Sequence, residues 1–425
     1  MHVQATGAGL MGLYDSVDPL VRDKVELSYD VSKQASVRFF EKLFYSSNAC
    51  DPGLQSCVIE LATDEPRAFC LTTPQLLKSR NSVRVTAPFR DPVWDRLCGG
   101  EGAESCGDLM EQLRPHVTDP DALAALLDTA LAPRVTHPDA EPPQDMRVRY
   151  FGHACVLVQG AGISVLIDPL VSYPGESSLD PFTFDDLPQR IDYVLITHPH
   201  QDHVVIEALL RLRHRVGHVV VGRAGGGSLG DVSLRLCLEH CGFRSVIELG
   251  EYEEIHFPGG RIIGAPFYGE HADLDIRSKV VHAIEMNGKS CILFADSNPP
   301  APEFYAPLRA MLGHVDCLFL GMECVGAPAS WLYGPMLKRT LTRGEDQSRR
   351  LDGCNGDKAL KMHEYFSPKR LYIYAMGAEP WITHITSIVY SEDLVQFKEA
   401  RRVERTVQSA GGHAELLFGK HEFRP

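Results

Sequence analysis

The chain has 425 residues, of which 44% are hydrophobic and 23% are charged. This is the composition of a folded globular protein, and the length predicts two domains or one large one. The formal net charge of −14 argues against a surface that binds nucleic acid non-specifically. The sequence contains no run of about 18 apolar residues, so we expect no membrane-spanning helix. We also expect no signal peptide, because the N-terminus lacks a basic start followed by an apolar run.

Twelve cysteines are scattered along the chain, and none forms a Cys-x-x-Cys pair. Free thiols in this number suit the reducing cytoplasm, which is the location that we expect. Cys237 and Cys241 lie four residues apart in an expected helix, with His240 between them. We interpret them as half-buried thiols on one helix face, with a small metal knuckle as the alternative.

The clearest change in composition lies at residues 136–146, which are rich in proline and acidic residues and favour neither helix nor strand. We expect a linker there, between an N-terminal domain (1–135) and a second domain (147–425). Nothing in the N-terminal part suggests chemistry. It could dimerise, cap the active site or dock a partner.

Three elements are expected in the N-terminal domain, which makes it mixed in character. Apolar residues at helical spacing predict a helix from Asp30 to Tyr45, and a second, shorter helix from Asp119 to Leu131. Between them, the stretch from Ser56 to Leu71 is strand-like in places.

After the linker, short apolar strands follow one another quickly. The first come as hairpins, with a tight turn at Ala161-Gly162. The later strands alternate with helical patterns at 204–216, 228–241, 301–313 and 357–366. This order predicts an α/β protein built as an αββα sandwich, in which two sheets pack together with helices outside.

The most informative motif is HPHQDH at residues 198–203, directly after a buried strand and before an expected helix. Alternate residues of an extended segment point the same way, so His198 and His200 can bind one metal ion. The chain then turns into the helix, where Asp202 and His203 project together toward a second ion. Imidazole and carboxylate ligands suit zinc or iron. The motif predicts a dinuclear metal site, with a polar loop of chance histidines as the alternative.

The motif resembles the HxHxDH signature of the metallo-β-lactamase superfamily. The segments 150–158 and 163–169 also resemble that family's opening hairpins, and the likeness covers about 147–425. Asp168 matches the position of a supporting carboxylate, which implies that it orients a metal ligand; a plain turn residue is the alternative. We interpret His153 as structural.

The resemblance implies further ligands after later strands. The strand 261–267 leads to Glu270 and His271, and both are candidates for a position that is usually histidine. Asp296, at the end of the strand that begins at Cys291, resembles the carboxylate that bridges the two metals; a helix-capping aspartate is the alternative. The last ligand should be a histidine near the final strand, 371–376. None follows that strand directly, so His384 and His363 both stay open.

Several stretches beyond the general signature resemble a small subgroup, the non-haem diiron oxygenases typified by the β-hydroxylase of chloramphenicol biosynthesis. These stretches are 267–273, 321–324, 330–335, 348–351 and 375–381. In that subgroup a separate N-terminal domain precedes the metal domain. The resemblance implies two iron ions, O2 as co-substrate and a homodimer formed through the N-terminal domain.

Glu270 gives a physical reason for iron. With Asp202 and Asp296 it makes three anionic oxygen donors, which stabilise ferric and higher iron states more than they help a zinc hydroxide. We therefore expect Glu270 and Asp296 to be catalytic. If His271 is the ligand instead, this argument for iron fails. The alternative is then an enzyme in which two zinc ions hydrolyse a lactone, ester or phosphodiester.

The type member of the subgroup acts on an amino acid tethered to a carrier protein, which implies an amino acid or its carrier-bound form as substrate. Electrons must come from an external donor, because no flavin or nicotinamide motif is visible. Positions after strand ends suggest aromatic and acidic substrate contacts, each with an ordinary packing or surface role as the alternative. They are Tyr268, His271, Asp273, Glu323, Trp331, Tyr333 and Glu379.

A basic cluster could meet an acidic carrier, or it could be a solvated loop face. It consists of Lys338, Arg339, Arg343, Arg349 and Arg350. Taken together, the sequence predicts a diiron oxygenase of specialised metabolism that hydroxylates or otherwise oxidises an amino-acid-derived substrate.

Overall fold

The computed structural model of the chain describes residues 9–29, 31, 33–61, 82–99, 106–130, 142–173, 179–271, 274–337, 339–348 and 350–425. Asp273, Lys338, Arg349, residues 62–71 of the expected strand-like stretch, and residues 136–141 of the expected linker lie outside these ranges. Among the described residues, no helix is both long enough and apolar enough to cross a membrane.

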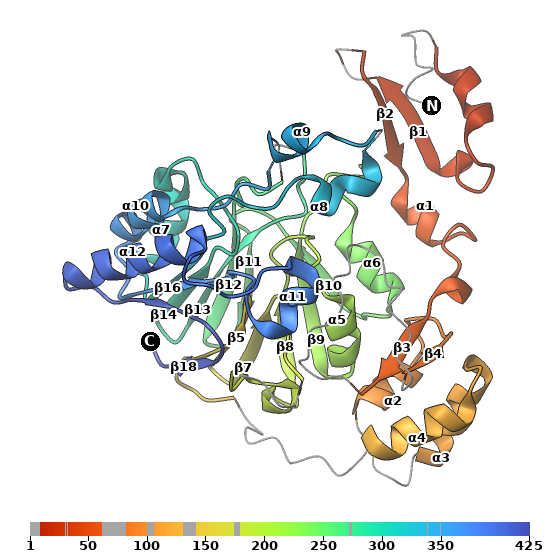
Figure 1. The fold of residues 1–425 in the computed structure, drawn as a ribbon, viewed down its shortest axis with the longest axis horizontal. Helices are drawn as coiled ribbons and strands as arrows, with labels where there is room; N and C mark the ends of the chain where they lie inside the picture. The colour runs from red at the N-terminus through yellow and green to blue at the C-terminus, as the bar shows by residue number, and fades with distance from the viewer. Residues whose placement is uncertain are drawn as a thin grey trace.

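Two seven-stranded sheets form the centre of the molecule (Figure 1). The first has the order β10-β9-β8-β7-β6-β5-β18. Its strands are β5 (Arg147–Gly152), β6 (Cys155–Gly160), β7 (Ile163–Ile167), β8 (Ile191–Leu195), β9 (Val216–Gly222), β10 (Val246–Leu249) and β18 (His421–Phe423). The second has the order β11-β12-β13-β14-β15-β16-β17. Its strands are β11 (Glu254–Phe257), β12 (Gly260–Ala265), β13 (Val281–Met286), β14 (Lys289–Leu293), β15 (Cys317–Gly321), β16 (Arg370–Tyr374) and β17 (Ala414–Leu416).

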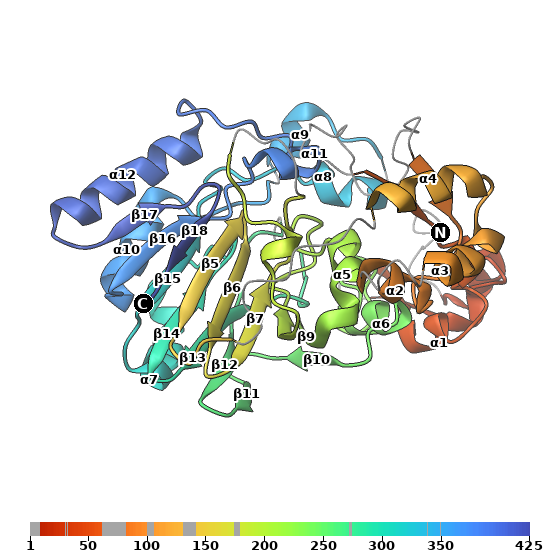
Figure 2. The same cartoon turned by 90° about the horizontal axis from the view of Figure 1, so that it is seen from below.

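Helices cover the outer faces of both sheets, so the predicted αββα sandwich is confirmed. Figure 2 shows α10 and α12 on one side and α5 and α6 on the other. The helices of this part are α5 (Ile206–Leu212), α6 (Leu234–His240), α7 (Ala306–Leu312), α8 (Ser330–Tyr333), α9 (Arg343–Ser348), α10 (Gly356–Phe366), α11 (Thr383–Thr386) and α12 (Val395–Ser409). The four helical patterns expected in this region match α5, α6, α7 and α10.

The central strands are buried on both faces, because successive side chains of a strand point to opposite sides of its sheet. Every residue of β6 and β15 is buried, because one face packs against the other sheet and the opposite face packs under helices. The core between the sheets includes Val156, Leu293 and Phe319. Two further cores lie under the helices on either side.

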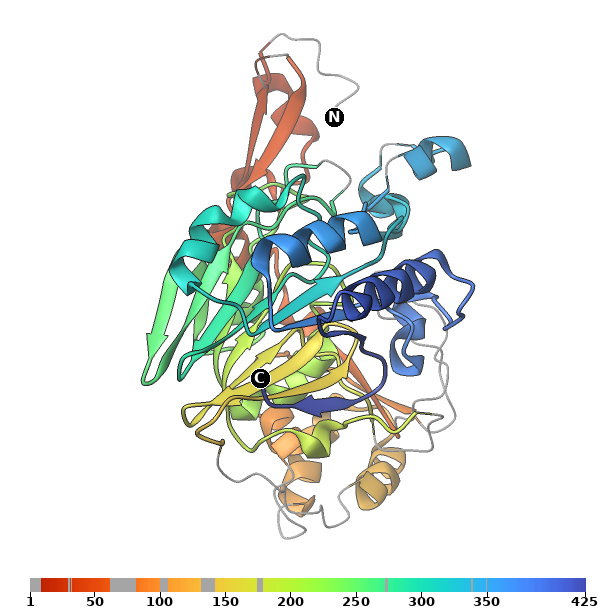
Figure 3. The same ribbon diagram turned by 90° about the vertical axis from the view of Figure 1, so that its left-hand side faces the viewer.

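The N-terminal region lies along the side of α5 and α6, with the β1–β2 hairpin and the helices α3 and α4 at opposite ends of the molecule (Figures 1 and 3). Its elements are β1 (Val25–Tyr29), β2 (Ala35–Phe39), α1 (Glu41–Tyr45), β3 (Cys57–Glu60), β4 (Ser82–Val85), α2 (Val93–Gly99), α3 (Cys106–Leu113) and α4 (Pro120–Ala130). A small core of its own includes Val85, Trp94 and Leu123. The helix expected from Asp119 to Leu131 matches α4.

The helix expected from Asp30 to Tyr45 is wrong for most of its length. Residues 35–39 form β2, which pairs antiparallel with β1, and only Glu41–Tyr45 is helical. Pairing with β1 provides hydrogen-bond partners for the backbone of this segment. Its side chains alternate between half-buried and exposed, and this period of two residues is that of a strand. Val31 and Leu43, two of the apolar residues at helical spacing that led us to expect the helix, are exposed.

Arg213, directly after α5, ties the N-terminal region to the metal domain. Its guanidinium is buried and donates from Nε to Asp95 Oδ1 at 2.8 Å and from Nη2 to Asp91 O at 2.9 Å. Nη1 donates to Phe89 O and, at 2.6 Å, to Cys241 O. One cation thus satisfies three groups of the N-terminal region and one carbonyl at the end of α6.

Replacing Arg213 by Met should lower the free energy of unfolding by about 3 kcal/mol, because a half-buried carboxylate and several carbonyls lose their buried donor. Urea denaturation measures this change. Arg190→Met is the control: Arg190 pairs with Asp192 but its side chain is 79% exposed, so its loss should cost less than about 1 kcal/mol. Equal effects of the two substitutions would contradict the role of Arg213.

Candidate metal centre

The HPHQDH motif forms a compact turn at the carboxyl end of β8. The amides of His203 and Val204 donate to His200 O at 3.0 and 2.8 Å. The helix that we expected to carry Asp202 and His203 begins only at Ile206, so this part of the prediction was wrong. The turn places the side chains of His198, His200, Asp202 and His203 at one edge of the sandwich, where they are almost completely buried.

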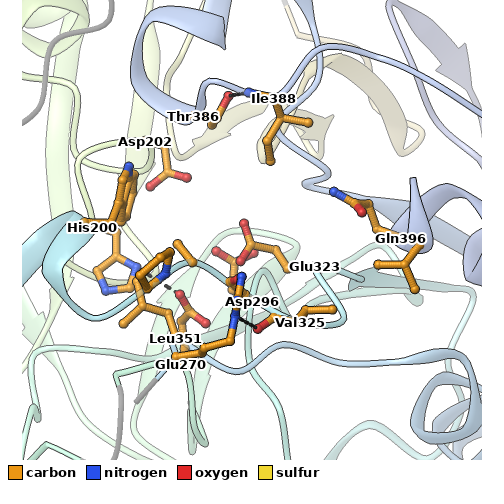
Figure 4. A pocket seen from close by; sticks show the side chains of 16 residues that line it. His200, Asp202, Glu270, Asp296, Glu323, Val325, Leu351, Thr386, Ile388 and Gln396 are labelled. Atoms are coloured by element: carbon orange, nitrogen blue, oxygen red, sulfur yellow. Dashed lines mark hydrogen bonds and ion pairs between the residues drawn. The ribbon is translucent and has the colours of Figure 1, made fainter. Parts of the chain in front are cut away.

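The second sheet brings its own side chains to the same edge. Glu270 follows β12, Asp296 follows β14 and Glu323 follows β15, and these three strands run in the same direction. Gly321 permits the close approach of the last two loops, because a Cβ there would lie 2.3 Å from Ala295 O. The ligands of the two sheets therefore meet where the carboxyl ends of their strands face each other (Figure 4).

Among the described residues, side-chain ligand atoms gather in four overlapping groups, each within 4.8 Å. The groups are His198, His200 and Glu270; His198, His203 and Asp296; Asp202, Asp296 and Glu323; and His153, Asp202 and His203. Asp296 belongs to two of them, one with two histidines and one with two carboxylates. In the first group its Oδ2 lies 2.9 Å from His203 Nε2 and 3.6 Å from His198 Nε2. Such overlap is what two neighbouring metal ions with a shared carboxylate require.

Several buried polar atoms of the site have no hydrogen-bond partner among the described residues. Burying such atoms without a partner costs free energy that a bound cation would recover. The nitrogen atoms are Nε2 of His198 and of His200, and both ring nitrogens of His153. The oxygen atoms are Asp202 Oδ1, Glu270 Oε2 and Asp296 Oδ1. Imidazole nitrogens and carboxylate oxygens are iron and zinc ligands, so the residues present fit a dinuclear metal centre.

The shifted pKa values of Glu270, Glu323 and His203 show that several buried carboxylates lie close together. Burial, with Glu323, Asp296 and Asp202 nearby, raises the pKa of Glu270 well above its usual range. Burial, with Asp296 and Asp202, does the same to Glu323. Burial alone would lower the pKa of His203, but three carboxylates around it raise that pKa well above its usual range. Without a metal ion this edge therefore holds protons that the ligands must release when metal binds.

Asp168 orients His203, as the sequence predicted for a supporting carboxylate. Its Oδ2 lies 2.8 Å from His203 Nδ1 and accepts from Thr197 Oγ1 at 2.6 Å, while Oδ1 accepts from the amide of Thr197 at 2.8 Å. An imidazole held at Nδ1 presents Nε2 to the site. This fixes both the tautomer and the direction of one ligand.

A cavity of about 370 Å³ opens onto these groups. In Figure 4, Asp202 and Glu270 lie near His200, Asp296 and Glu323 lie in the middle of the view, and Ile388 and Gln396 lie at the opposite side from His200. The remaining lining is largely apolar, with Arg350 as the one cation among the described lining residues. The full lining is His200, Asp202, Glu270, Asp296, Glu323, Val325, Gly326, Ala327, Pro328, Trp331, Arg350, Leu351, Thr386, Ile388, Val395 and Gln396.

Of the residues predicted to contact substrate, Glu323 and Trp331 line the cavity. The ring of Trp331 lies 5.9 Å from that of His200. His271 is buried behind the site, with its ring 4.4 Å from His200. The others that the structure describes pack outside the lining: Tyr268 lies against Phe304 and Tyr305, Tyr333 packs with Leu351, and Glu379 is buried beside Tyr150.

The two candidates for the last ligand lie elsewhere. His363 is in α10 and His384 is in α11, and neither joins any of the four ligand groups of the described residues. His153, which we interpreted as structural, does join one, with Nε2 3.4 Å from Asp202 Oδ2. Glu270, rather than His271, is the member of the group with His198 and His200.

The chain matches known proteins along its whole length. Residues 1–130 match the N-terminal domain of the diiron non-haem β-hydroxylases, and residues 147–253 match the β-lactamase superfamily domain. Over 423 residues the chain is 36% identical to the 4-amino-L-phenylalanyl-[CmlP-peptidyl-carrier-protein] 3-hydroxylase of Streptomyces venezuelae, covering 98% of this chain and 79% of that protein. The chain belongs to the diiron non-haem β-hydroxylase family.

The structure of this β-hydroxylase agrees with that assignment. It superposes on the crystal structure of CmlA, a diiron β-hydroxylase from S. venezuelae, with a TM-score of 0.88 and 35% identity, covering 99% of this chain and 79% of that one. A short stretch of 58 residues is also 41% identical to a UPF0173 protein of Pyrococcus abyssi, covering 14% of this chain and 23% of that protein. The predicted diiron oxidoreductase is therefore confirmed over the zinc hydrolase.

Sequence reasoning missed part of the site. Glu323 follows β15 as Asp296 follows β14, so the same strand-end rule could have marked it as a ligand as well as a substrate contact. The lining also includes the end of α11, the segment after it and the start of α12, with Thr386, Ile388, Val395 and Gln396. No signal in the sequence separates them from other loop residues.

Replacing Asp168 by Asn in this β-hydroxylase should weaken iron binding by about 10- to 100-fold, because an amide cannot hold both Thr197 and His203 in their present orientation. Iron per chain, measured after dialysis against a ferrous chelator, reports the change. Asp192→Asn is the control, since Asp192 is a buried carboxylate of β8 that accepts from the amide of Ser164 at 2.9 Å. Iron retention equal to wild type in Asp168→Asn would contradict the orienting role.

Proposed function

We propose that this β-hydroxylase binds two iron ions at the edge where its sheets meet. One position uses His198, His200 and Glu270, the other uses Asp202, His203 and Glu323, and Asp296 is shared. The observation that carries this assignment is the position of Asp296 between His198 and His203, with carboxylates on both sides. The excess of carboxylates over imidazoles supports iron, because hard anionic donors stabilise its higher oxidation states.

A diiron centre held there supplies the O2-dependent oxidation of a C–H bond. The chain's own residues prepare the site for it. Asp168 fixes His203, and Glu270 and Asp296, the residues that we expected to be catalytic, contribute negative charge to both positions. The apolar walls around Val325, Leu351 and Ile388 exclude water from the reacting carbon.

We propose an aromatic or apolar amino acid, carried as a thioester on a carrier protein, as the substrate. The relative from S. venezuelae acts on a 4-amino-phenylalanyl carrier protein. In the present chain the cavity has room for a side chain of that size, and its walls are largely apolar. Arg350 is fixed at the lining by bonds to the carbonyls of Val325 and Gly326. There it can meet an anionic group of the carrier or of its pantetheine arm.

The other partners follow from the same proposal. An external electron donor must reduce the irons between turnovers. The described lining residues all come from the metal domain, which favours dimerisation over capping as the role of residues 1–135, and the exposed Val31, Leu43 and Leu54 support an apolar contact there. The cysteines whose side chains are described are free thiols, which supports the cytoplasm as the location.

Turnover with a loaded carrier protein tests the function. The full chain, reconstituted with ferrous iron, is given O2, a chemical reductant and a carrier protein charged with phenylalanine or 4-amino-phenylalanine. We expect mass spectrometry to show the gain of one oxygen atom on the aminoacyl group, with the oxygen derived from labelled O2. Hydrolysis of lactones or esters by a zinc-loaded protein that leaves the carrier-bound substrate unoxidised would overturn the proposal.

Replacing Glu270 by His restores the ligand type that hydrolases of this fold use. Loss of one negative charge should shift metal preference from iron toward zinc and lower hydroxylation by roughly 10-fold or more, equivalent to about 1.4 kcal/mol of activation free energy. Metal analysis of protein purified with both metals present measures the first effect. Glu285→Gln, which changes a carboxylate of β13 bonded to Arg261, should leave the preference unchanged. Unaltered iron content and activity in Glu270→His would count against the ligand assignment.

A further inference from the structure

Glu379 is a buried carboxylate for which the metal-binding groups give no role. It is 1% exposed and lies in the loop after β16, close to where the sequence led us to expect the last histidine ligand. Its Oε1 accepts from Tyr150 Oη at 2.6 Å and from the amide of His153 at 2.8 Å. Its Oε2 has no hydrogen-bond partner among the described residues. Both recorded donors are neutral.

The turn that Glu379 contacts is strained and is held from three directions. β5 has an irregular register with β6 between Tyr150 and Gly152, and His153 then adopts φ 48°. The amide of His153 binds Glu379, its carbonyl accepts from the amide of Ala375 at 3.0 Å, and Trp381 presses on Gly152. Gly152 has φ 107°, and a Cβ there would lie 2.4 Å from the Trp381 ring. A left-handed non-glycine residue persists only where its surroundings determine it.

The restrained turn aims the imidazole of His153 at a proposed metal ligand. Its Nε2 lies 3.4 Å from Asp202 Oδ2, a polar contact longer than a usual hydrogen bond, and its ring centroid lies 4.9 Å from that of His203. His153 is fully buried, so no water competes for this contact. An irregular strand end that redirects a side chain is a known feature beside active sites.

We propose that Glu379 is a positioning residue for the second metal position, acting through His153 on Asp202. The carboxylate fixes the amide of His153, the fixed turn holds the imidazole, and the imidazole sets the orientation of Asp202. The chain of contacts from Glu379 to Asp202 thus consists of one backbone hydrogen bond, one restrained turn and one polar contact between side chains. This inference rests on the proposed assignment of Asp202 to the second iron.

Glu379→Gln tests the proposal in the full chain, because the substitution keeps the shape and removes the charge and one acceptor site. We expect the second iron to bind about 10- to 100-fold more weakly, as is usual when the partner of a ligand is lost. At limiting ferrous iron the content should fall from two irons per chain toward one. The near-ultraviolet absorption of the oxidised iron pair should fall in parallel. Tyr150→Phe, which removes one anchor of Glu379, should shift both readouts in the same direction by a smaller amount.

The controls separate positioning from a loss of folding. Asp192→Asn, the matched change at a buried carboxylate of β8 in the other sheet, should keep two irons. The melting temperature of metal-free Glu379→Gln should fall no further than that of Asp192→Asn. In a His153→Ala background, Glu379→Gln should cause no additional loss of iron, because residues that act through one another are not additive.

The outcomes are distinct. If the wild-type chain does not bind two irons, the proposed function fails. If the wild type binds two irons and Glu379→Gln binds both with the same affinity and the same absorption, the inference alone is overturned. It is also overturned if Asp192→Asn loses iron equally, or if Glu379→Gln lowers iron content further when His153 is already Ala.

Discussion

Mutual repulsion among buried carboxylates is the constraint on which the metal edge of this molecule depends. Asp202, Asp296 and Glu323 offer oxygens within 4.8 Å of one another, and Glu270 lies close enough for these charges to raise its pKa. Such a set is stable only around strong positive charge. Two metal ions would supply it, and the position of Lys279 fits the same logic. Lys279 donates to Gly269 O at 2.9 Å and, as a cation near Glu270, favours its charged form.

Backbone strain is concentrated at this same edge. Left-handed non-glycine residues occur where strands end beside the site: His153, Asp168, Glu270, Ala295, Cys324 and Ala375. Each costs about 1–3 kcal/mol, and such strain persists where the surrounding structure over-determines it. Five of these turns lie at or next to a side chain that faces the ligand groups, namely His153, Asp168, Glu270, Asp296 and Glu323. The rigid sandwich beneath, with its fully buried strands, holds these turns in place.

The balance of ligands separates this site from a hydrolase built on the same sandwich. A hydroxide-generating zinc pair needs undiminished metal charge, so neutral imidazoles serve it well. Here Glu270 takes a position that is usually histidine, and Glu323 adds a further carboxylate beside Asp296. The loop after β16 carries Glu379, whose carboxylate holds the turn at His153. The residues that favour iron therefore lie in the loops at the carboxyl edge of the sheets.

The sequence alone was enough to predict the fold class, the first candidate ligands and the preference for iron. Strand and helix periods are local, and HPHQDH lies within one turn, so both are visible in the order of residues. Only the tertiary structure decided which distant side chains join that turn. It placed Glu270 with His198 and His200, brought Glu323 beside Asp296, and left His363 and His384 outside the described ligand groups. It also turned the expected helix at 35–39 into a strand, because pairing with β1 satisfies that backbone. Contacts between loops far apart in the chain depend on how the two sheets pack and which strand ends lie side by side. The local order of residues does not contain that information.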